Sequence, residues 1–376
     1  MNAHSETTRL PTVPAIAGPA SQRLMSLDAL RGFDMFWIVG ADALGEALAN
    51  FKGGPITKLA AKQLEHAPWE GFHFYDLIFP LFVFMIGVAI TFSLGRLVAT
   101  EGRNAALKRV VRRAAPLYVL GLFYYGGLNG HIDHIRLLGV LQRLALCYLF
   151  AGLLFVYLRP RGLVAVCIAL LVGYWALLTF VPVPEFGAGD FAERHNLTNW
   201  IDRMYLPWRK WDGDHDPEGL LSTLPAIASC LLGVFAGLLL RDPARSERQK
   251  VACLAVAGAA LVGLGYAWGL EFPVIKKIWT SSFVLVAGGF STLLLAAFYL
   301  VIDVWKLRMW AMPLVWIGAN ALTIYIISNV VDFGKLSDRF AGGDVAKWLN
   351  SQRQGLGGLV LALVSIALCM AICRFL

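Results

Sequence analysis

Long apolar stretches constrain this chain more than any other feature of its sequence. Residues 74–98 begin with aromatic side chains and continue as an almost uninterrupted apolar run. A run of 18 or more such residues is long enough to cross a bilayer as a helix. Across the chain, 58% of residues are hydrophobic and 15% are charged, whereas soluble domains carry about 25% charge. The sequence therefore predicts an all-α polytopic membrane protein.

The apolar runs and the short basic turns between them predict about ten transmembrane helices. Because arginine and lysine gather in cytoplasmic connections, the basic turns place both chain termini in the cytoplasm. The densest basic segment, residues 96–113, is expected to be a short cytoplasmic connection. The predicted spans are 27–49, 74–98, 114–128, 137–157, 163–181, 219–240, 251–270, 279–304, 312–331 and 358–373.

We divide the chain into two parts. Residues 1–22 are polar and lack a signal-peptide pattern, so we expect a disordered cytoplasmic tail. Residues 23–376 are expected to form a single transmembrane domain. Three polar stretches would then be periplasmic loops: 50–73, 182–218 and 332–355.

The net charge of +8 fits membrane orientation and contact with anionic lipid better than nucleic-acid binding, since no nucleic-acid-binding pattern occurs. The six cysteines lie in apolar runs without a C-x-x-C motif, so we expect neither disulfides nor a zinc site. Asp212-x-Asp214-x-Asp216 has the spacing that opens a calcium loop, but the glycine and the twelfth-position glutamate of an EF-hand are missing. We expect no metal.

The stretch 65–80 holds the strongest candidate for chemistry. His66, Trp69, Glu70 and Asp76 crowd the mouth of the second predicted span. A histidine that titrates near neutral pH suits proton transfer at such a place. The alternative is an interfacial loop anchored by its aromatic residues, with His66 merely solvated. Spacing alone leaves these two interpretations equal.

Further polar groups are predicted on the same, periplasmic face. Asp42 lies toward the end of the first span, Gln142 and Arg143 lie just inside the fourth, and Asn320 interrupts the ninth. The opposite face carries Arg109, Arg112 and Arg113, and guanidinium groups bind phosphate in a bidentate manner. Orientation bias alone would also produce these arginines, so phosphate binding is plausible for the cluster rather than for any one of them.

Six motifs occur in one order along nearly the whole chain. They are Arg23-x3-Leu27-Asp28-Ala29-Leu30-Arg31-Gly32, His66-Ala67-Pro68-Trp69-Glu70-Gly71, Asp76-Leu77-Ile78-Phe79-Pro80-Leu81-Phe82-Val83-Phe84-Met85-Ile86-Gly87, Ile135-Arg136-x2-Gly139-Val140-Leu141-Gln142-Arg143-Leu144, Asp216-Pro217-Glu218-Gly219-Leu220-Leu221-Ser222-Thr223 and Lys277-x-Trp279-Thr280-Ser281-Ser282-Phe283-Val284. Together they resemble the transmembrane acyltransferase family typified by heparan-α-glucosaminide N-acetyltransferase.

The resemblance implies transfer of an acetyl group from cytoplasmic acetyl-CoA to the amino group of a glucosamine-type sugar or glycan across the bilayer. It also implies that His66 is the active-site histidine, acting as a base or as an acetyl carrier. The chain departs from its eukaryotic relatives at Asp42, where they carry asparagine. It also lacks their lysosomal N-terminal extension, so we expect a bacterial inner-membrane protein. A homodimer is left open.

From these residues we predict specific roles. Asp42 and Asp76 would orient the catalytic His66. Trp69, Glu70, Gln142, Arg143 and Asn320 are assigned to substrate binding, and Arg109, Arg112 and Arg113 to acetyl-CoA. Two other functions stay open. One is an O-acyltransferase of envelope polysaccharide, and the other is a proton-coupled transporter that uses the intramembrane charges Asp28, Arg31, Asp34 and Arg143.

Overall fold

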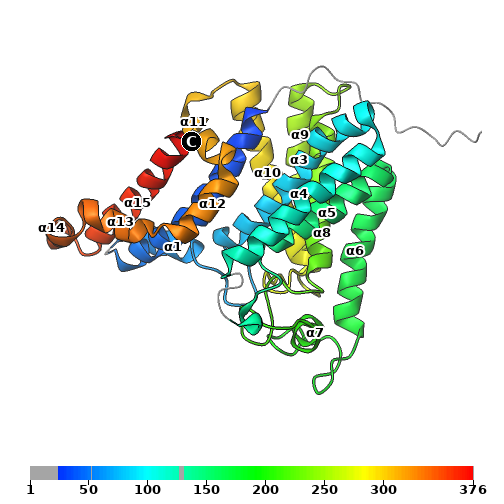
Figure 1. Cartoon of the computed structure of the whole chain (residues 1–376), viewed down its shortest axis with the longest axis horizontal. Coiled ribbons are helices and arrows are strands. Elements are labelled where there is room, and N and C mark those ends of the chain that lie inside the picture. The colour runs from blue at the N-terminus through cyan, green and yellow to red at the C-terminus, as the bar shows by residue number, and fades with distance from the viewer. Residues whose placement is uncertain (1–23, 52, 127–130, 376) are drawn as a thin grey trace, which may run out of the picture.

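The computed structural model describes residues 24–51, 53–126 and 131–375, and these residues are almost entirely helical (Figure 1). No strand occurs among them, and the only extended pairings are two isolated β-bridges, Glu70 with Ile275 and Val183 with Gly187. The all-α prediction is thus confirmed for the described residues. The predicted tail, residues 1–22, lies outside them.

Fifteen α-helices follow one another along the described residues. They are α1 (Met25–Asn50), α2 (Pro55–Gln63), α3 (Ile78–Glu101), α4 (Arg103–Tyr124), α5 (Val140–Tyr157), α6 (Pro160–Phe180), α7 (Leu197–Tyr205), α8 (Thr223–Leu240), α9 (Glu247–Trp268), α10 (Ser281–Phe298), α11 (Met312–Ala319), α12 (Ala321–Val330), α13 (Phe333–Ala341), α14 (Gly343–Gln352) and α15 (Leu356–Phe375). A 3-10 turn, η1 (Phe74–Leu77), leads into α3, and a π-helical turn, η3 (Tyr299–Val304), extends α10.

Seven of the described helices, with η1 and η3 counted as parts of α3 and α10, are long and apolar enough to cross a membrane. An eighth crossing is provided if α11 and α12, bent by 67° at Asn320, form one broken span. This is a multi-pass membrane protein. The other two predicted spans fall on α1 and α4, whose acidic or basic side chains lower their hydropathy. The count of ten therefore stays a prediction.

The basic segment 96–113 is not the connection that the sequence predicted. Helix α3 continues to Glu101, a single residue, Gly102 (φ 85°), forms the turn, and α4 starts at Arg103. The segment's arginines and lysines therefore lie on helices. Arginine and lysine are good helix formers, and their long stems carry the charge away from the helix axis. The predicted third span, 114–128, overlaps only the second half of α4.

Each stretch predicted as a periplasmic loop contains short helices. Helix α2 lies in 50–73, α7 in 182–218, and α13 and α14 in 332–355. Polar composition marks these stretches as extramembrane, but it does not distinguish an irregular loop from a surface helix. Helices α7 and α13 are each covered on one side: α13 buries Phe333 and Ser337, and α7 buries Leu197 together with the polar residues Thr198, Asn199 and Asp202.

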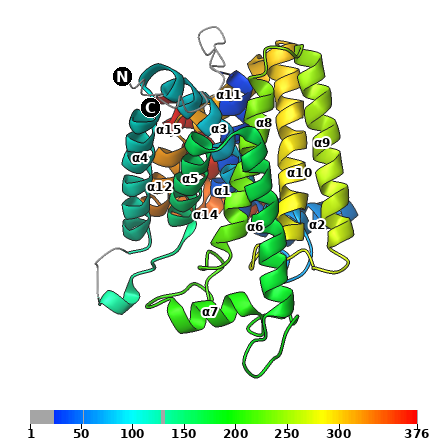
Figure 2. The same cartoon turned by 90° about the vertical axis from the view of Figure 1, so that its right-hand side faces the viewer.

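Close helix crossings hold the bundle together (Figures 1 and 2). Helices α3 and α8 meet where Gly87 faces the backbone of Cys230 and Gly233 faces the backbone of Phe84. Small residues allow two helix backbones to approach closely. In a membrane, helices associate through such close packing, because the hydrophobic effect does not drive them together there. Helix α1 packs on α11 and α15 on one side and on α3 and α10 on the other. Both views place α7 at the end of the bundle away from the start of α1.

We expect Gly87→Val to lower the thermal stability of the detergent-solubilised protein. A β-carbon at residue 87 would overlap the carbonyl of Cys230, so α3 and α8 must separate. Such overpacking costs about 1–3 kcal/mol. Gly173→Val is the matched control, because nothing lies within 4 Å of a β-carbon at that position of α6. Equal melting temperatures for the two variants would contradict the crossing.

Candidate active site

A buried carboxylate organises the loop that carries His66. Asp76 is fully buried, and its Oδ1 lies 2.9 Å from Nδ1 of His66. Its Oδ2 accepts the backbone N–H groups of Ala67 (3.2 Å) and His73 (3.0 Å). With Nδ1–H donated to Asp76, the imidazole presents Nε2 as a base. The His66 side chain is 51% exposed, so a substrate can reach the ring.

Lys276 completes this group, although it is 210 positions away in the chain. Its Nζ lies 2.9 Å from Nδ1 and 3.2 Å from Nε2 of His66, and 3.4 Å from Oδ1 of Asp76. Burial lowers the pKa of Lys276, while the negative charges of Asp76 and Glu218 act in the opposite direction. The site therefore combines an accessible imidazole with a buried carboxylate and an amine.

Lys276 was not among the residues predicted from the sequence. The residue stands directly before the Lys277-x-Trp279-Thr280 motif, which was the only available signal. Backbone pairing brings it to the site: Glu70 bridges to Ile275, and the N–H of Gly71 donates to the carbonyl of Val274 at 2.9 Å. This pairing joins the His66 loop to the connection between α9 and α10.

Trp69 and Glu70 hold the loop in place. The indole N–H of Trp69 donates to the carbonyl of Phe191 at 3.0 Å, and its ring packs on the apolar cluster around Phe272 and Ile275. Glu70 takes part through its backbone, and its side chain is exposed. Their assignment to substrate binding stays a prediction.

Asp42 reaches the site through Tyr75. The His66 ring stacks on the Tyr75 ring with centroids 4.5 Å apart and planes 6° apart. The Tyr75 hydroxyl in turn interacts with the carboxylate of Asp42 on α1. Asp42 also lines a cavity of about 1150 Å³ between α1 and the segment from α12 to α15. Four carboxylates line this cavity: Asp42, Glu46, Asp332 and Asp338.

A buried arginine network lies at the same end of the bundle. Arg136 donates from Nε and Nη2 to the two oxygens of Asp216, at 2.8 and 2.7 Å, and also to Glu218. The guanidinium of Arg143 lies 4.9 Å from the centre of the Trp279 ring and donates to Ser222. These contacts secure the segment that leads into α8, and the charge of Glu218 acts on Lys276.

Gln142 belongs to the same network, whereas Asn320 does not. Gln142 donates to the carbonyl of Arg136 at 3.1 Å. Asn320 lies at the break between α11 and α12 and donates to Trp316 and Cys373. With Asp28 and Arg374 it lines a recess at the start of α1. Asp42 follows Asp28 by fourteen residues, which is about 21 Å along a helix. The structure thus separates Asn320 from His66.

Arg113 opens onto an apolar cavity of about 240 Å³ inside the bundle. The cavity is lined by residues of α1, α3, α4, α5 and α12, including Phe79 and Ser93. Phe79 follows Asp76 by three residues and contacts Trp279, with ring centroids 5.2 Å apart. The cavity wall therefore runs along α3 from Phe79, near the start of the helix, to Ser93, and includes Arg113 of α4. Arg109 and Arg112 lie on the turn of α4 before Arg113; Arg109 is partly buried and Arg112 is exposed.

The buried carboxylate of Asp202 on α7 predicts how the stability of the folded protein changes with pH. Burial raises the pKa of Asp202 to about 6. The backbone N–H groups of Leu220 and Asp216 donate to its carboxylate and act in the opposite direction, lowering the pKa. Between pH 4 and 6 the unfolded chain loses this proton while the folded chain keeps it, so the folded state loses stability as pH rises. Asp202→Asn removes the titrating group. We therefore expect the substitution to abolish a pH-dependent change of up to about 3 kcal/mol in the free energy of unfolding.

Thermal unfolding of the wild type and of Asp202→Asn at pH 4, 5, 6 and 7 would measure the effect. The melting temperature of Asp202→Asn, relative to that of the wild type at the same pH, should rise as the pH increases across this range. A gain that is constant with pH would show that Asp202 is ionised in the folded protein.

Comparisons with known proteins identify the family of this chain. Residues 23–266 match the family model described as heparan-alpha-glucosaminide N-acetyltransferase, catalytic. The human protein named heparan-alpha-glucosaminide N-acetyltransferase is 28% identical over 82% of this chain and 53% of its own length. The mouse protein of the same name is 26% identical over 85% of this chain and 55% of its own. The chain thus spans about half the length of these relatives. It belongs to the heparan-alpha-glucosaminide N-acetyltransferase catalytic family.

Proposed function

We propose that this protein is a transmembrane N-acetyltransferase that moves the acetyl group of acetyl-CoA to the amino group of a glucosamine-type sugar. The observation that carries the proposal is the group formed by His66, Asp76 and Lys276, together with the Arg113 cavity, whose wall includes Phe79, three residues after Asp76. Base and donor cavity thus lie in one bundle. The family and the names of its relatives support the same reaction class.

The basic helix and the apolar cavity would take the donor. Arg109, Arg112 and Arg113 offer charges to the phosphates of acetyl-CoA, since arginine pairs with phosphate through two parallel hydrogen bonds. The cavity, with its almost wholly apolar wall, suits the slender thioester-bearing arm. By the positive-inside rule this end faces the cytoplasm, and His66 faces the periplasm of a bacterial inner membrane.

The reaction then needs a base, an orienting group and a cation. His66 removes a proton from the sugar amine through Nε2, while Asp76 fixes the ring. The amine nitrogen bonds to the thioester carbon, and the carbon–sulfur bond breaks to release coenzyme A. Lys276 stabilises the negative charge that develops on the carbonyl oxygen. Direct transfer is proposed over an acetyl-imidazole, because one bundle can hold both substrates together.

The acidic cavity beside Asp42 favours an amine as acceptor. Its four carboxylates face one lysine, Lys335, which is itself paired with Asp332 at 3.1 Å. Such a surface attracts an ammonium group through its charge, and a neutral hydroxyl lacks this charge attraction. Asp42 also contacts the His66 site through Tyr75, so it adds to this preference. The O-acyltransferase is therefore the second candidate.

We expect His66→Ala and Asp76→Asn to lower the rate of glucosamine-dependent coenzyme A release by at least about hundredfold, because general-base catalysis contributes about 10²–10⁴. Purified protein in detergent with acetyl-CoA and glucosamine provides the assay, and free thiol is the readout. His131→Ala is the control, since this exposed histidine lies outside the group. Full activity of His66→Ala would end the assignment.

The same assay separates the alternatives. N-acetylglucosamine in place of glucosamine should give no release, because its nitrogen is already acylated. Release with N-acetylglucosamine would favour the O-acyltransferase. Absence of release with either sugar, together with sugar uptake into proteoliposomes, would favour the transporter.

Arg113→Glu should raise the KM for acetyl-CoA by at least about tenfold and leave the KM for glucosamine unchanged, because a charged hydrogen bond contributes about 1.5–3 kcal/mol. Arg161→Glu, an exposed arginine on α6, is the matched control. Equal KM values for the two variants would remove Arg113 from the donor site.

A further inference from the structure

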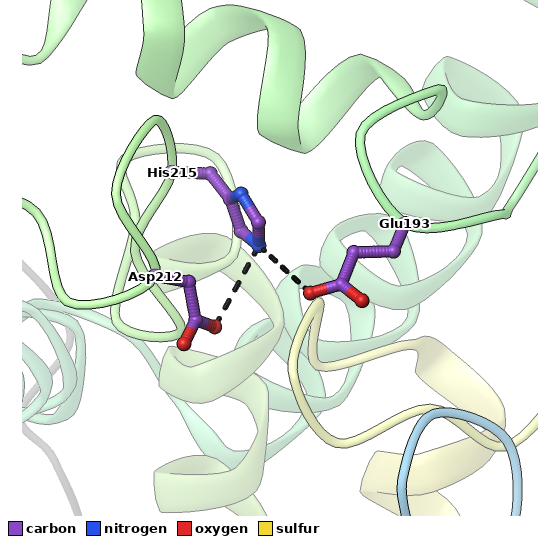
Figure 3. A group of neighbouring side chains, drawn as sticks. All are labelled: Glu193, Asp212 and His215. Carbon is purple, nitrogen blue, oxygen red and sulfur yellow. Dashed lines mark ion pairs between the residues drawn. The ribbon is translucent and has the colours of Figure 1, made fainter.

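Three side chains outside the His66 group converge in the segment between α6 and α8. They are Glu193, Asp212 and His215, whose ligand atoms all lie within 4.8 Å of one another (Figure 3). His215 is fully buried, and Figure 3 shows its ring edge facing the two carboxylates. A histidine and two carboxylates on one centre form a donor set that zinc uses.

The spacing of these atoms is that of metal ligands and not of hydrogen-bond partners. Nε2 of His215 lies 3.5 Å from Oε1 of Glu193 and 3.6 Å from Oδ2 of Asp212. Bonds of about 2.0–2.1 Å to a tetrahedral zinc ion would place such atoms about 3.3 Å apart. Among the described residues, Nε2 of the fully buried His215 has no hydrogen-bond partner, while Oδ2 of Asp212 and Oε1 of Glu193 meet the ammonium group of Lys277. A buried imidazole nitrogen without a hydrogen bond is costly unless something else binds it.

The other nitrogen of His215 is held as in a metal site. Nδ1 lies 2.7 Å from Oδ1 of Asp214, so a proton on Nδ1 is donated to this carboxylate and Nε2 carries the free lone pair. Metal-binding histidines are commonly oriented by such a carboxylate, which also makes the ring more basic. The adjacent residue thus fixes the tautomer that a metal requires.

The ammonium group of Lys277 contacts both carboxylates of the cluster, which shows that the cluster accommodates a positive charge. Its Nζ lies 3.1 Å from Oδ2 of Asp212 and 3.4 Å from Oε1 of Glu193. The side chain is 34% exposed and has a flexible stem, so its ammonium group can leave toward solvent. Lys277 therefore balances the two carboxylates when no metal is bound and competes with a metal for them.

We propose that Glu193, Asp212 and His215 bind a zinc ion, with water as the fourth ligand. The imidazole nitrogen favours zinc over calcium or magnesium, which prefer oxygen ligands alone. The ion would fasten the stretch after α6 to the turn before α8. It would lie beside Lys277, the neighbour of the active-site residue Lys276. The site does not depend on the proposed acetyl transfer.

Titration of the metal-free protein with Zn²⁺ by calorimetry tests the proposal, with metal content after dialysis as a second readout. We expect one zinc per chain, no binding to His215→Asn, and binding about 10–100-fold weaker to Asp214→Asn. His195→Asn is the matched control, since His195 pairs with Asp190 in the same segment, lies outside the cluster and should leave the affinity unchanged. Ca²⁺ and Mg²⁺ should bind much more weakly than Zn²⁺.

Lys277→Gln keeps the test decisive if His215→Asn fails to fold. Removing the competing ammonium group should tighten zinc binding by about fivefold, which is the scale of one partly exposed ion pair. Weaker or unchanged binding in Lys277→Gln, or equal zinc affinity in the His215 and His195 variants, would overturn the site. The visible spectrum of the Co²⁺-substituted protein should also change from tetrahedral to solvent-like in His215→Asn.

Discussion

The Asp76 carboxylate is the interaction on which the candidate site depends. A buried charge is very costly unless it is paired and hydrogen-bonded, so the chain around it must supply partners. Here two backbone N–H groups, one imidazole and one ammonium group do so. They come from the loop before α3 and from the connection after α9, which the carboxylate thereby ties together. The position of His66 is thus a consequence of satisfying Asp76.

The bundle separates two kinds of surface. Carboxylates and histidines gather around the end that holds His66, whereas α4 begins with a run of basic residues. The apolar cavity wall lies between them and is lined by five helices. Under the proposed function, a donor with charged phosphates and a polar acceptor would reach one another without either crossing the bilayer. We propose group transfer through the membrane, rather than carriage of a whole sugar, for this reason.

Buried polar networks give the His66 end its definite shape. Arg136 is nearly inaccessible to solvent, yet it pairs with two carboxylates and lies over the rings of Tyr125 and Trp211. Such pairs add little net stability, because desolvation offsets most of the attraction. They do penalise other arrangements, since breaking one leaves a charge unpaired. The segment between α6 and α8 is fixed in this way, and with it the cluster around His215.

The sequence by itself determined the membrane-embedded helices, because a bilayer forces each crossing segment to be apolar and helical. It also determined His66 and Asp76 as candidates, since they lie ten residues apart in one loop. Lys276 was decided only by the tertiary structure, through backbone pairing between segments some 200 residues apart, and periodicity carries no information about such pairing. The separation of Asn320 from His66 was likewise decided by the course of α1, and Arg113 acquired its cavity only when five helices packed around it.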